Sequence, residues 1–184
     1  MASGSSPICG EGSRTRRAAV LAGVLLFALA TASASTDIYV ETAIDPSGQL
    51  RISTKHRHEI IPKKEVDQVG FEKAQISPDG RAVGWLALYP NCCTSYPIPL
   101  KLVILSSGGQ RTFTGNGLPI WRWCFWMEGK QVAFEQETAH GGMGVHYELH
   151  DLGNGDLIDK YDPDANADTV TKPPKWVVIL DARE

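Results

Sequence analysis

Short runs of alternating hydrophobic and polar residues recur along the chain from residue 37 onward. Residues 37–44 and 49–54 are the first two runs, and the turn-forming Asp45-Pro46-Ser47-Gly48 separates them. A period of two predicts half-buried β-strands, and Pro and Gly supply the backbone angles of tight turns. Residues 55–68 are charged and contain Pro62, so we expect a loop there with at most a short strand or helical turn.

A strand–turn–strand pattern then occurs twice. The first copy has strands at 71–76 and 81–88 around Ser77-Pro78-Asp79-Gly80, and the second has strands at 120–126 and 130–135 around Met127-Glu128-Gly129. Gly80 aligns with Gly129, and Arg81 with Lys130. In each copy an apolar strand, a glycine turn and another strand follow, at 100–105 and 110–114 and at 145–152 and 157–161. Regular turns between short strands predict an all-β fold of antiparallel sheets, and the repeat indicates a blade-like unit.

The turn Ser77-Pro78-Asp79-Gly80-Arg81, with the following "RAVGW" and "LVILSSGGQRTFT", resembles the repeats of TolB-type β-propellers. The resemblance covers about two copies, residues 71–114 and 120–161, and Met127-Glu128-Gly129-Lys130 replaces the turn in the second. It implies a propeller-like fold of the kind used as an interaction surface. A propeller ring typically needs at least four blades, and this chain has material for two or three. We therefore expect residues 35–184 to form one β-rich domain, either two compact sheets or a partial propeller.

The C-terminal part combines an expected loop with an expected closing strand. Residues 162–174 are acidic and then Pro-rich, which predicts a loop. Residues 175–180, "KWVVIL", are strongly β-prone. An unpaired apolar strand would favour aggregation, so we expect this one to pair in a sheet, beside residues 37–44.

The first 34 residues have the layout of a secretory signal peptide. Arg14, Arg16 and Arg17 precede a short apolar run at 18–30, and Ala32-Ser33-Ala34 supplies a small-residue cleavage site. The alternative is a membrane anchor, but the run is shorter than the roughly 20 residues that span a bilayer. We expect cleavage after Ala34 and export to a periplasm or the cell exterior, with no membrane span left in the mature chain.

Composition narrows the partners of the mature chain. Of the 18 basic and 21 acidic residues, three arginines and Glu11 leave with the signal, so 15 basic and 20 acidic residues remain, a net charge of −5. Nucleic acid and anionic membrane surfaces need a basic footprint, and both are disfavoured. Another exported protein is the expected class of partner.

Three cysteines stay in the mature chain: Cys92, Cys93 and Cys124. A disulfide is the expected state of two of them in an oxidising compartment. Neighbouring cysteines rarely bridge each other, because the peptide between them resists the geometry. We expect Cys124 to pair with Cys93, or alternatively with Cys92.

His146, Glu148 and His150 alternate along an expected strand and should project from one face, with Tyr147 and Leu149 on the other. Two imidazoles and a carboxylate are ligand types for a divalent metal such as zinc, with His140 as a possible further ligand. The competing interpretation is an ordinary polar, solvated strand face.

Two further stretches could bind ligands. Residues 162–168 alternate oxygen-bearing side chains like the start of a calcium loop, but Ala167 and Pro173 stand where the loop needs Gly and an acid. Trp121, Trp123 and Phe125 share a strand face, and they are expected to fill a core between sheets rather than a sugar- or protein-docking surface.

No nucleophile elbow, phosphate-binding loop, His-Glu-x-x-His motif or dinucleotide fingerprint occurs in the sequence. The sequence therefore predicts an exported β-rich binding or scaffold module that is not an enzyme and has no cofactor. The alternative is a metal-binding protein or metal-dependent hydrolase centred on His146, Glu148 and His150.

Overall fold

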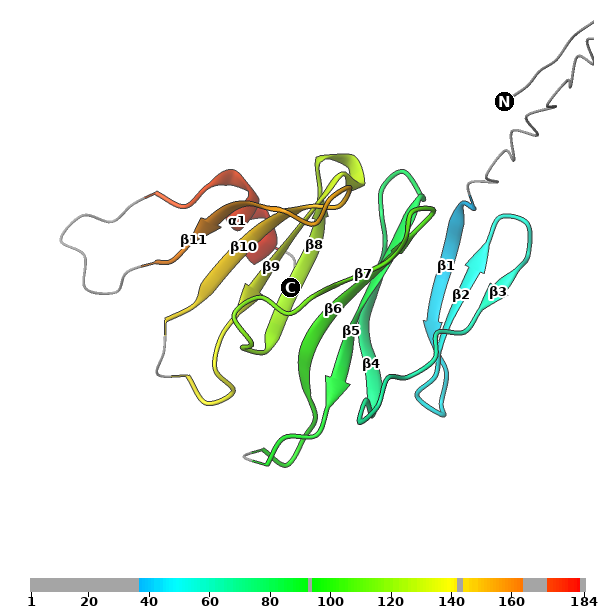
Figure 1. Cartoon of the computed structure of the whole chain (residues 1–184), viewed down its shortest axis with the longest axis horizontal. Helices are drawn as coiled ribbons and strands as arrows, with labels where there is room; N and C mark the ends of the chain where they lie inside the picture. The colour runs from blue at the N-terminus through cyan, green and yellow to red at the C-terminus, as the bar shows by residue number, and fades with distance from the viewer. Residues whose placement is uncertain (1–36, 93, 142–143, 164–171, 183–184) are drawn as a thin grey trace, which may run out of the picture. The chain divides into compact units, whose positions relative to one another are not determined.

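The computed structural model describes residues 37–92, 94–141, 144–163 and 172–182. They belong to the second of the two units into which the chain divides, residues 34–184. The proposed signal peptide lies outside the described residues. Within them the fold is almost entirely β, with three antiparallel sheets and a single short α-helix (Figure 1), which confirms the predicted all-β class.

Each sheet is a meander in which strands adjacent in the chain pair with each other. The first sheet contains β1 (Tyr39–Ile44), β2 (Leu50–Thr54) and β3 (Glu59–Ile60). The second contains β4 (Gly70–Ile76), β5 (Ala82–Tyr89), β6 (Ile98–Ser106) and β7 (Gly109–Phe113). The third contains β8 (Ile120–Trp126), β9 (Gln131–Gln136), β10 (His146–Asp151) and β11 (Leu157–Tyr161), with the 3₁₀ turn η1 (Met127–Gly129) after β8. The two repeat copies thus correspond to the second and third sheets.

Two apolar layers hold the sheets face to face. Leu50 and Ile52 of the first sheet pack against Val83 and Trp85 of β5. Leu86 follows Trp85 in β5, so its side chain points to the other face of the sheet. It belongs to the apolar layer between the second and third sheets. The second sheet is therefore covered on both faces, which explains why β5 is a nearly continuous apolar run rather than an alternating one.

The first strands of successive sheets lie side by side. β1 lies against β4, and side-chain hydrogen bonds join β4 to β8. The Lys73 ammonium donates to the Trp121 carbonyl at 2.7 Å, and the Trp123 indole donates to the Lys73 carbonyl at 3.0 Å. Gln75 adds a bond from its side-chain amide to the Trp123 carbonyl at 3.1 Å. These bonds fix the register of the third sheet on the second.

The prediction of a closing strand at residues 175–180 is wrong, because these residues form the helix α1 (Lys175–Asp181). Its buried residues are Trp176, Val177 and Leu180, a helical spacing, and they pack on the outward face of the third sheet. Pro174 occupies the N-cap, where its fixed φ suits a helix start. The run is apolar from Trp176 onward, so its periodicity could not distinguish a strand from a helix, and packing against the sheet decided the outcome.

The two ends of the stack are finished differently. The helix α1 covers the third sheet, whereas the outward face of the first sheet is polar. On that face Arg51 pairs at 3.0 Å with both Asp45 and Glu59. The register places Glu41 opposite Ser53 on the same face. A polar outer face is what a terminal unit of a stacked array requires for solubility.

Candidate functional site

Four side chains form a continuous hydrogen-bonded chain on the face of β10 that points toward the second sheet. The carboxylate of Glu148 contacts His146 Nε2 at 2.9 Å through one oxygen and His150 Nε2 at 2.7 Å through the other. The second ring nitrogen of His146 contacts Asp162, just after β11. The second ring nitrogen of His150 lies 3.1 Å from the Gly155 carbonyl oxygen. We call His146, Glu148, His150 and Asp162 the β10 cluster.

The three β10 residues of the cluster are largely buried and only Asp162 is exposed, so the competing prediction of an ordinary solvated strand face is wrong. His146 and Glu148 are 9% and 6% exposed. The imidazole of His150 stacks on Phe134 of β9, with 5.3 Å between ring centroids, and lies 5.0 Å from Phe113 of β7. These aromatic rings exclude water from the side of the cluster that faces the second sheet.

Opposite charges control protonation in the β10 cluster. Burial acts to lower the pKa of His146, but the hydrogen bonds and charges of Asp162 and Glu148 outweigh it, so the pKa is raised. Burial acts to raise the pKa of Glu148, and the bonds from His150 and His146 reverse this, so the pKa is lowered. Both shifts favour the ion pair. A His146 ring that donates from both nitrogens satisfies both carboxylates.

The geometry bears on the predicted metal site without testing metal binding itself. The three predicted ligands lie together, but each histidine faces a separate oxygen of Glu148. Over the residues that the structure describes, no group of three or more His, Cys, Asp or Glu side chains converges as metal ligands. The other suggested ligand, His140, is exposed in the connection from β9 to β10. Sequence spacing had not revealed Asp162, because it follows the next strand.

The predicted calcium loop falls mainly outside the described residues, which end at Pro163 and resume at Lys172. Its first residue, Asp162, belongs to the β10 cluster. Two of the three aromatic residues predicted to fill the core do so, whereas Trp121 is only half-buried, because a bulge between Ile120 and Arg122 puts Ile120 in the core instead. Trp123 and Phe125 are 2% and 4% exposed and lie in the layer between the second and third sheets.

The predicted disulfide stays a prediction. Cys124 is fully buried under α1, and Cys92 is exposed after β5. No disulfide joins these two in the described part of the chain. Cys93, the preferred partner of Cys124, lies outside the described residues.

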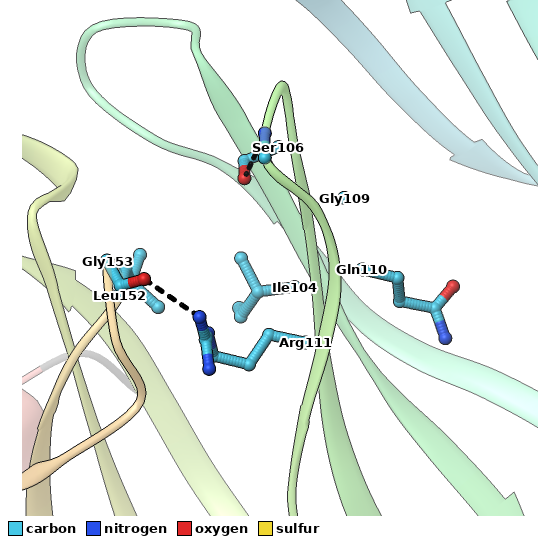
Figure 2. Close-up of a pocket in the computed structure, with 8 residues that line it drawn as sticks. Ile104, Ser106, Gly109, Gln110, Arg111, Leu152 and Gly153 are labelled. Atoms are coloured by element: carbon cyan, nitrogen blue, oxygen red, sulfur yellow. Dashed lines mark hydrogen bonds between the residues drawn. The ribbon is translucent and has the colours of Figure 1, made fainter. Parts of the chain in front are cut away.

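A second candidate site, not predicted from the sequence, consists of two adjoining hollows where hairpin turns of the second and third sheets meet. The smaller has a volume of about 280 Å³ and lies between the β6–β7 turn and the β10–β11 turn (Figure 2). The larger has a volume of about 550 Å³ and extends to the β4–β5 turn and η1. Ser106, Leu152 and Gly153 line both. We call the pair the turn-end hollows.

Close packing of two repeat-related turns forms the floor of the larger hollow. Gly129 has φ +87°, and a Cβ atom there would lie 2.8 Å from Cβ of Ser77 and 3.2 Å from Oδ1 of Asp79. Gly80, its counterpart in the first copy, has φ +70°, and a Cβ atom there would lie 3.0 Å from Cγ2 of Ile38 and 3.3 Å from the carbonyl oxygen of Tyr39. The glycine of each turn thus allows the turn to lie on the preceding sheet. The aligned cations Arg81 and Lys130 follow these glycines and line the same hollow.

Arg111 closes the smaller hollow. Its guanidinium donates to the Gly153 and Asn154 carbonyls, each at 2.8 Å, and so ties β7 to the β10–β11 turn. Figure 2 shows Arg111 reaching across toward Gly153, while the neighbouring Gln110 points away. Among the residues that the structure describes, the Arg111 guanidinium bonds to these two carbonyls and pairs with no carboxylate.

The acids of the hollows are engaged in their own turns. Asp79 accepts from the Ser77 hydroxyl at 2.6 Å and from the Arg81 backbone at 3.1 Å. Burial acts to raise the pKa of Asp79, but these bonds and the charge of Arg81 lower it overall. Asp151 accepts from the backbone of Gly153 and of Asn154 at 2.7 and 3.1 Å.

No protein-family model matches the sequence, and a search of curated proteins returns no match. None of the helices in the described ranges has the length and apolar content needed to cross a membrane.

Proposed function

We propose that the mature chain is an exported, non-catalytic binding module that holds another exported protein at the turn-end hollows. The observation that carries this proposal is that four hairpin turns, two from the second sheet and two from the third, surround the two adjoining hollows. Concave sites on a rigid scaffold are the usual location of binding surfaces. The charge–apolar–small order of residues 14–34 supports export.

The arrangement of the sheets supports the propeller-like part of the proposal. Meander sheets that stack face to face, with their first strands side by side, are the pattern of propeller blades. TolB-type repeats were suggested by the turn at Ser77–Arg81, and that turn here positions Arg81 at the larger hollow. Fold analogy is a weak argument for function, so the hollows carry the proposal.

A matched pair of blocking substitutions tests the binding role. Ser107 is exposed at the larger hollow, and Ser95 is exposed in the β5–β6 loop at the opposite ends of these strands. Full-length wild-type chain, Ser107→Trp and Ser95→Trp are expressed in the source cell, cross-linked, recovered from the extracytoplasmic fraction and analysed by mass spectrometry. We expect one identified protein with wild type and Ser95→Trp, and its loss with Ser107→Trp. Retention of that protein by Ser107→Trp, or no reproducible partner, contradicts the proposal.

The same samples test export. A mature chain that begins at Ser35 is expected in the extracytoplasmic fraction. An uncleaved chain confined to the cytosol would remove the basis for an exported partner.

A further inference from the structure

We infer that the ligand of the turn-end hollows is an acidic peptide segment, whose carboxylates contact Arg81 and Lys130. The inference rests on the proposed function and adds the chemical class of the ligand. It begins with the repeat relationship: two aligned cations, one from each repeat, reach the same hollow from neighbouring sheets. A chain with more acids than bases places cations together here.

The cations of the hollows are available to a ligand. Both Arg81 and Lys130 are exposed. The Lys130 ammonium has no hydrogen-bond or ion-pair partner among the residues that the structure describes. Arg111 adds a third positive charge in the adjoining hollow, held in place by the two carbonyls of the β10–β11 turn. A carboxylate that enters would therefore form new charge-assisted hydrogen bonds rather than displace existing ones.

The acids of the lining favour an acidic peptide over nucleic acid. Three cations (Arg81, Lys130, Arg111) and two carboxylates (Asp79, Asp151) line the two hollows, so their net charge is only +1. Nucleic acid needs a denser positive surface, because its affinity comes mainly from phosphate neutralisation. A peptide suits a mixed lining, since its carboxylates meet the cations while its backbone N–H groups can donate to Oδ2 of Asp79 and Asp151 and to the Ser106 and Ser107 hydroxyls.

The test uses fluorescein-labelled hexaglutamate as the probe and fluorescence anisotropy as the readout. The site variant combines Arg81→Gln with Lys130→Gln. The control combines Lys63→Gln with Lys160→Gln, which removes the same charge from exposed positions outside the hollows. We expect hexaglutamate to bind wild type and control equally and to bind the site variant about tenfold or more weakly, because two charge-assisted contacts are lost. Labelled hexalysine is expected not to bind at the same protein concentration.

Three outcomes overturn the inference: no binding of hexaglutamate to wild type, equal weakening in both double variants, or full displacement of the peptide by an equal concentration of inorganic phosphate. The second would indicate bulk electrostatics, and the third a small-anion site. A further result distinguishes failure of this inference from failure of the proposed function. If Ser107→Trp releases the cross-linked partner but Arg81→Gln with Lys130→Gln retains it, the binding role stands and the acidic-segment inference falls.

Discussion

Gly129 lies so close to Ser77 that a Cβ atom on the glycine would be 2.8 Å from Cβ of the serine. Atoms do not come so close unless one of them shifts, and both Ser77 and Asp79 belong to a turn that its own hydrogen bonds hold in place. The contact joins the corresponding turns of two sheets, and both the stability of the stack and the shape of the larger hollow depend on it.

The first prediction compares Gly129→Ala with Gly48→Ala. Both glycines have positive φ, at +87° and +75°, but a Cβ on Gly48 meets nothing within 4 Å. Both variants lose about 1–2 kcal/mol to left-handed backbone strain, and Gly129→Ala loses a further ~1–3 kcal/mol to overpacking. Urea denaturation measures the two free energies of unfolding. Equal losses would show that the turns are not in contact.

A pair of adjacent valines tests the helix α1. Val177 is 1% exposed and Val178 is 49% exposed. Val177→Ala should cost about 1.5–3 kcal/mol from lost methyl burial and a cavity, and Val178→Ala close to nothing. A strand would give the reverse pattern, because it places Val178 on one face with Trp176 and Leu180. Chemical denaturation of both variants decides between the two, with the larger loss at Val178 contradicting the helix.

The miss at α1 shows where sequence reasoning reached its limit. Strands such as β2 and β10 were predicted because alternation has only one structural meaning over five or six residues, and turn residues fixed their ends. In "KWVVIL" every position from Trp176 onward is apolar, so β-branched content alone favoured a strand. The helix forms because the outward face of the third sheet, with Cys124, Tyr147 and Leu149, needs an apolar cover.

The candidate sites, too, could be predicted from the sequence only in part. The spacing of His146, Glu148 and His150 was enough to place three side chains on one face. Their partner Asp162 depends on the pairing of β10 with β11, which spacing within one strand does not reveal. The turn-end hollows depend on how sheets stack. The only sequence signal for them was the repeat alignment of Arg81 with Lys130, which identified equivalent turns but not that they meet.

Gln136 is expected to be indispensable for the connection between β7 and β8. Its fully buried amide donates to the Thr114 and Leu118 carbonyls and accepts from the Asn116 backbone. Gln136→Leu should cost ~1–3 kcal/mol, because it removes three hydrogen bonds to the β7–β8 connection. The Thr114 carbonyl still accepts from the Gly117 N–H, whereas the Leu118 carbonyl and the Asn116 N–H lose the bond to Gln136. The control Gln110→Leu changes an exposed side chain and should cost less than about 0.5 kcal/mol. Thermal unfolding of both variants measures the difference, and similar melting temperatures would refute the role of Gln136.

The β10 cluster predicts a pH dependence of stability. Because the pKa of His146 is raised from 6.5, its contribution is complete below that pH and is lost as pH rises through the folded-state pKa. Because the pKa of Glu148 is lowered from 4.5, its contribution is present above that pH and is lost as pH falls through its folded-state pKa. The contribution of the ion pair is therefore greatest between these values.

His146→Gln provides the measurement. The difference in unfolding free energy between wild type and His146→Gln should be larger at about pH 5.5 than at alkaline pH, and it should decline as pH rises through the raised folded-state pKa of His146. His56→Gln, at an exposed position, should show no such difference between the two pH values. A wild-type advantage that grows toward alkaline pH would mean that the cluster does not hold a charged His146.

The metal content of the purified protein distinguishes the binding module from the metal-binding alternative. Protein purified from its natural compartment should contain no stoichiometric zinc, and a chelator should leave its melting temperature unchanged, because the ring nitrogens of His146 and His150 are engaged with Glu148. A bound metal would stabilise the folded state. Stoichiometric zinc that disappears in His146→Ala and His150→Ala would establish the metal-binding alternative instead.

The outward faces of the stack differ from the faces between the sheets. The first sheet has one apolar face and one mainly polar face, and α1 covers the outward face of the third sheet. The second sheet, apolar on both sides, is the one unit whose faces fit neighbours in both directions. Duplication of residues 70–119 would therefore insert a sheet whose two faces both fit the neighbours that it meets.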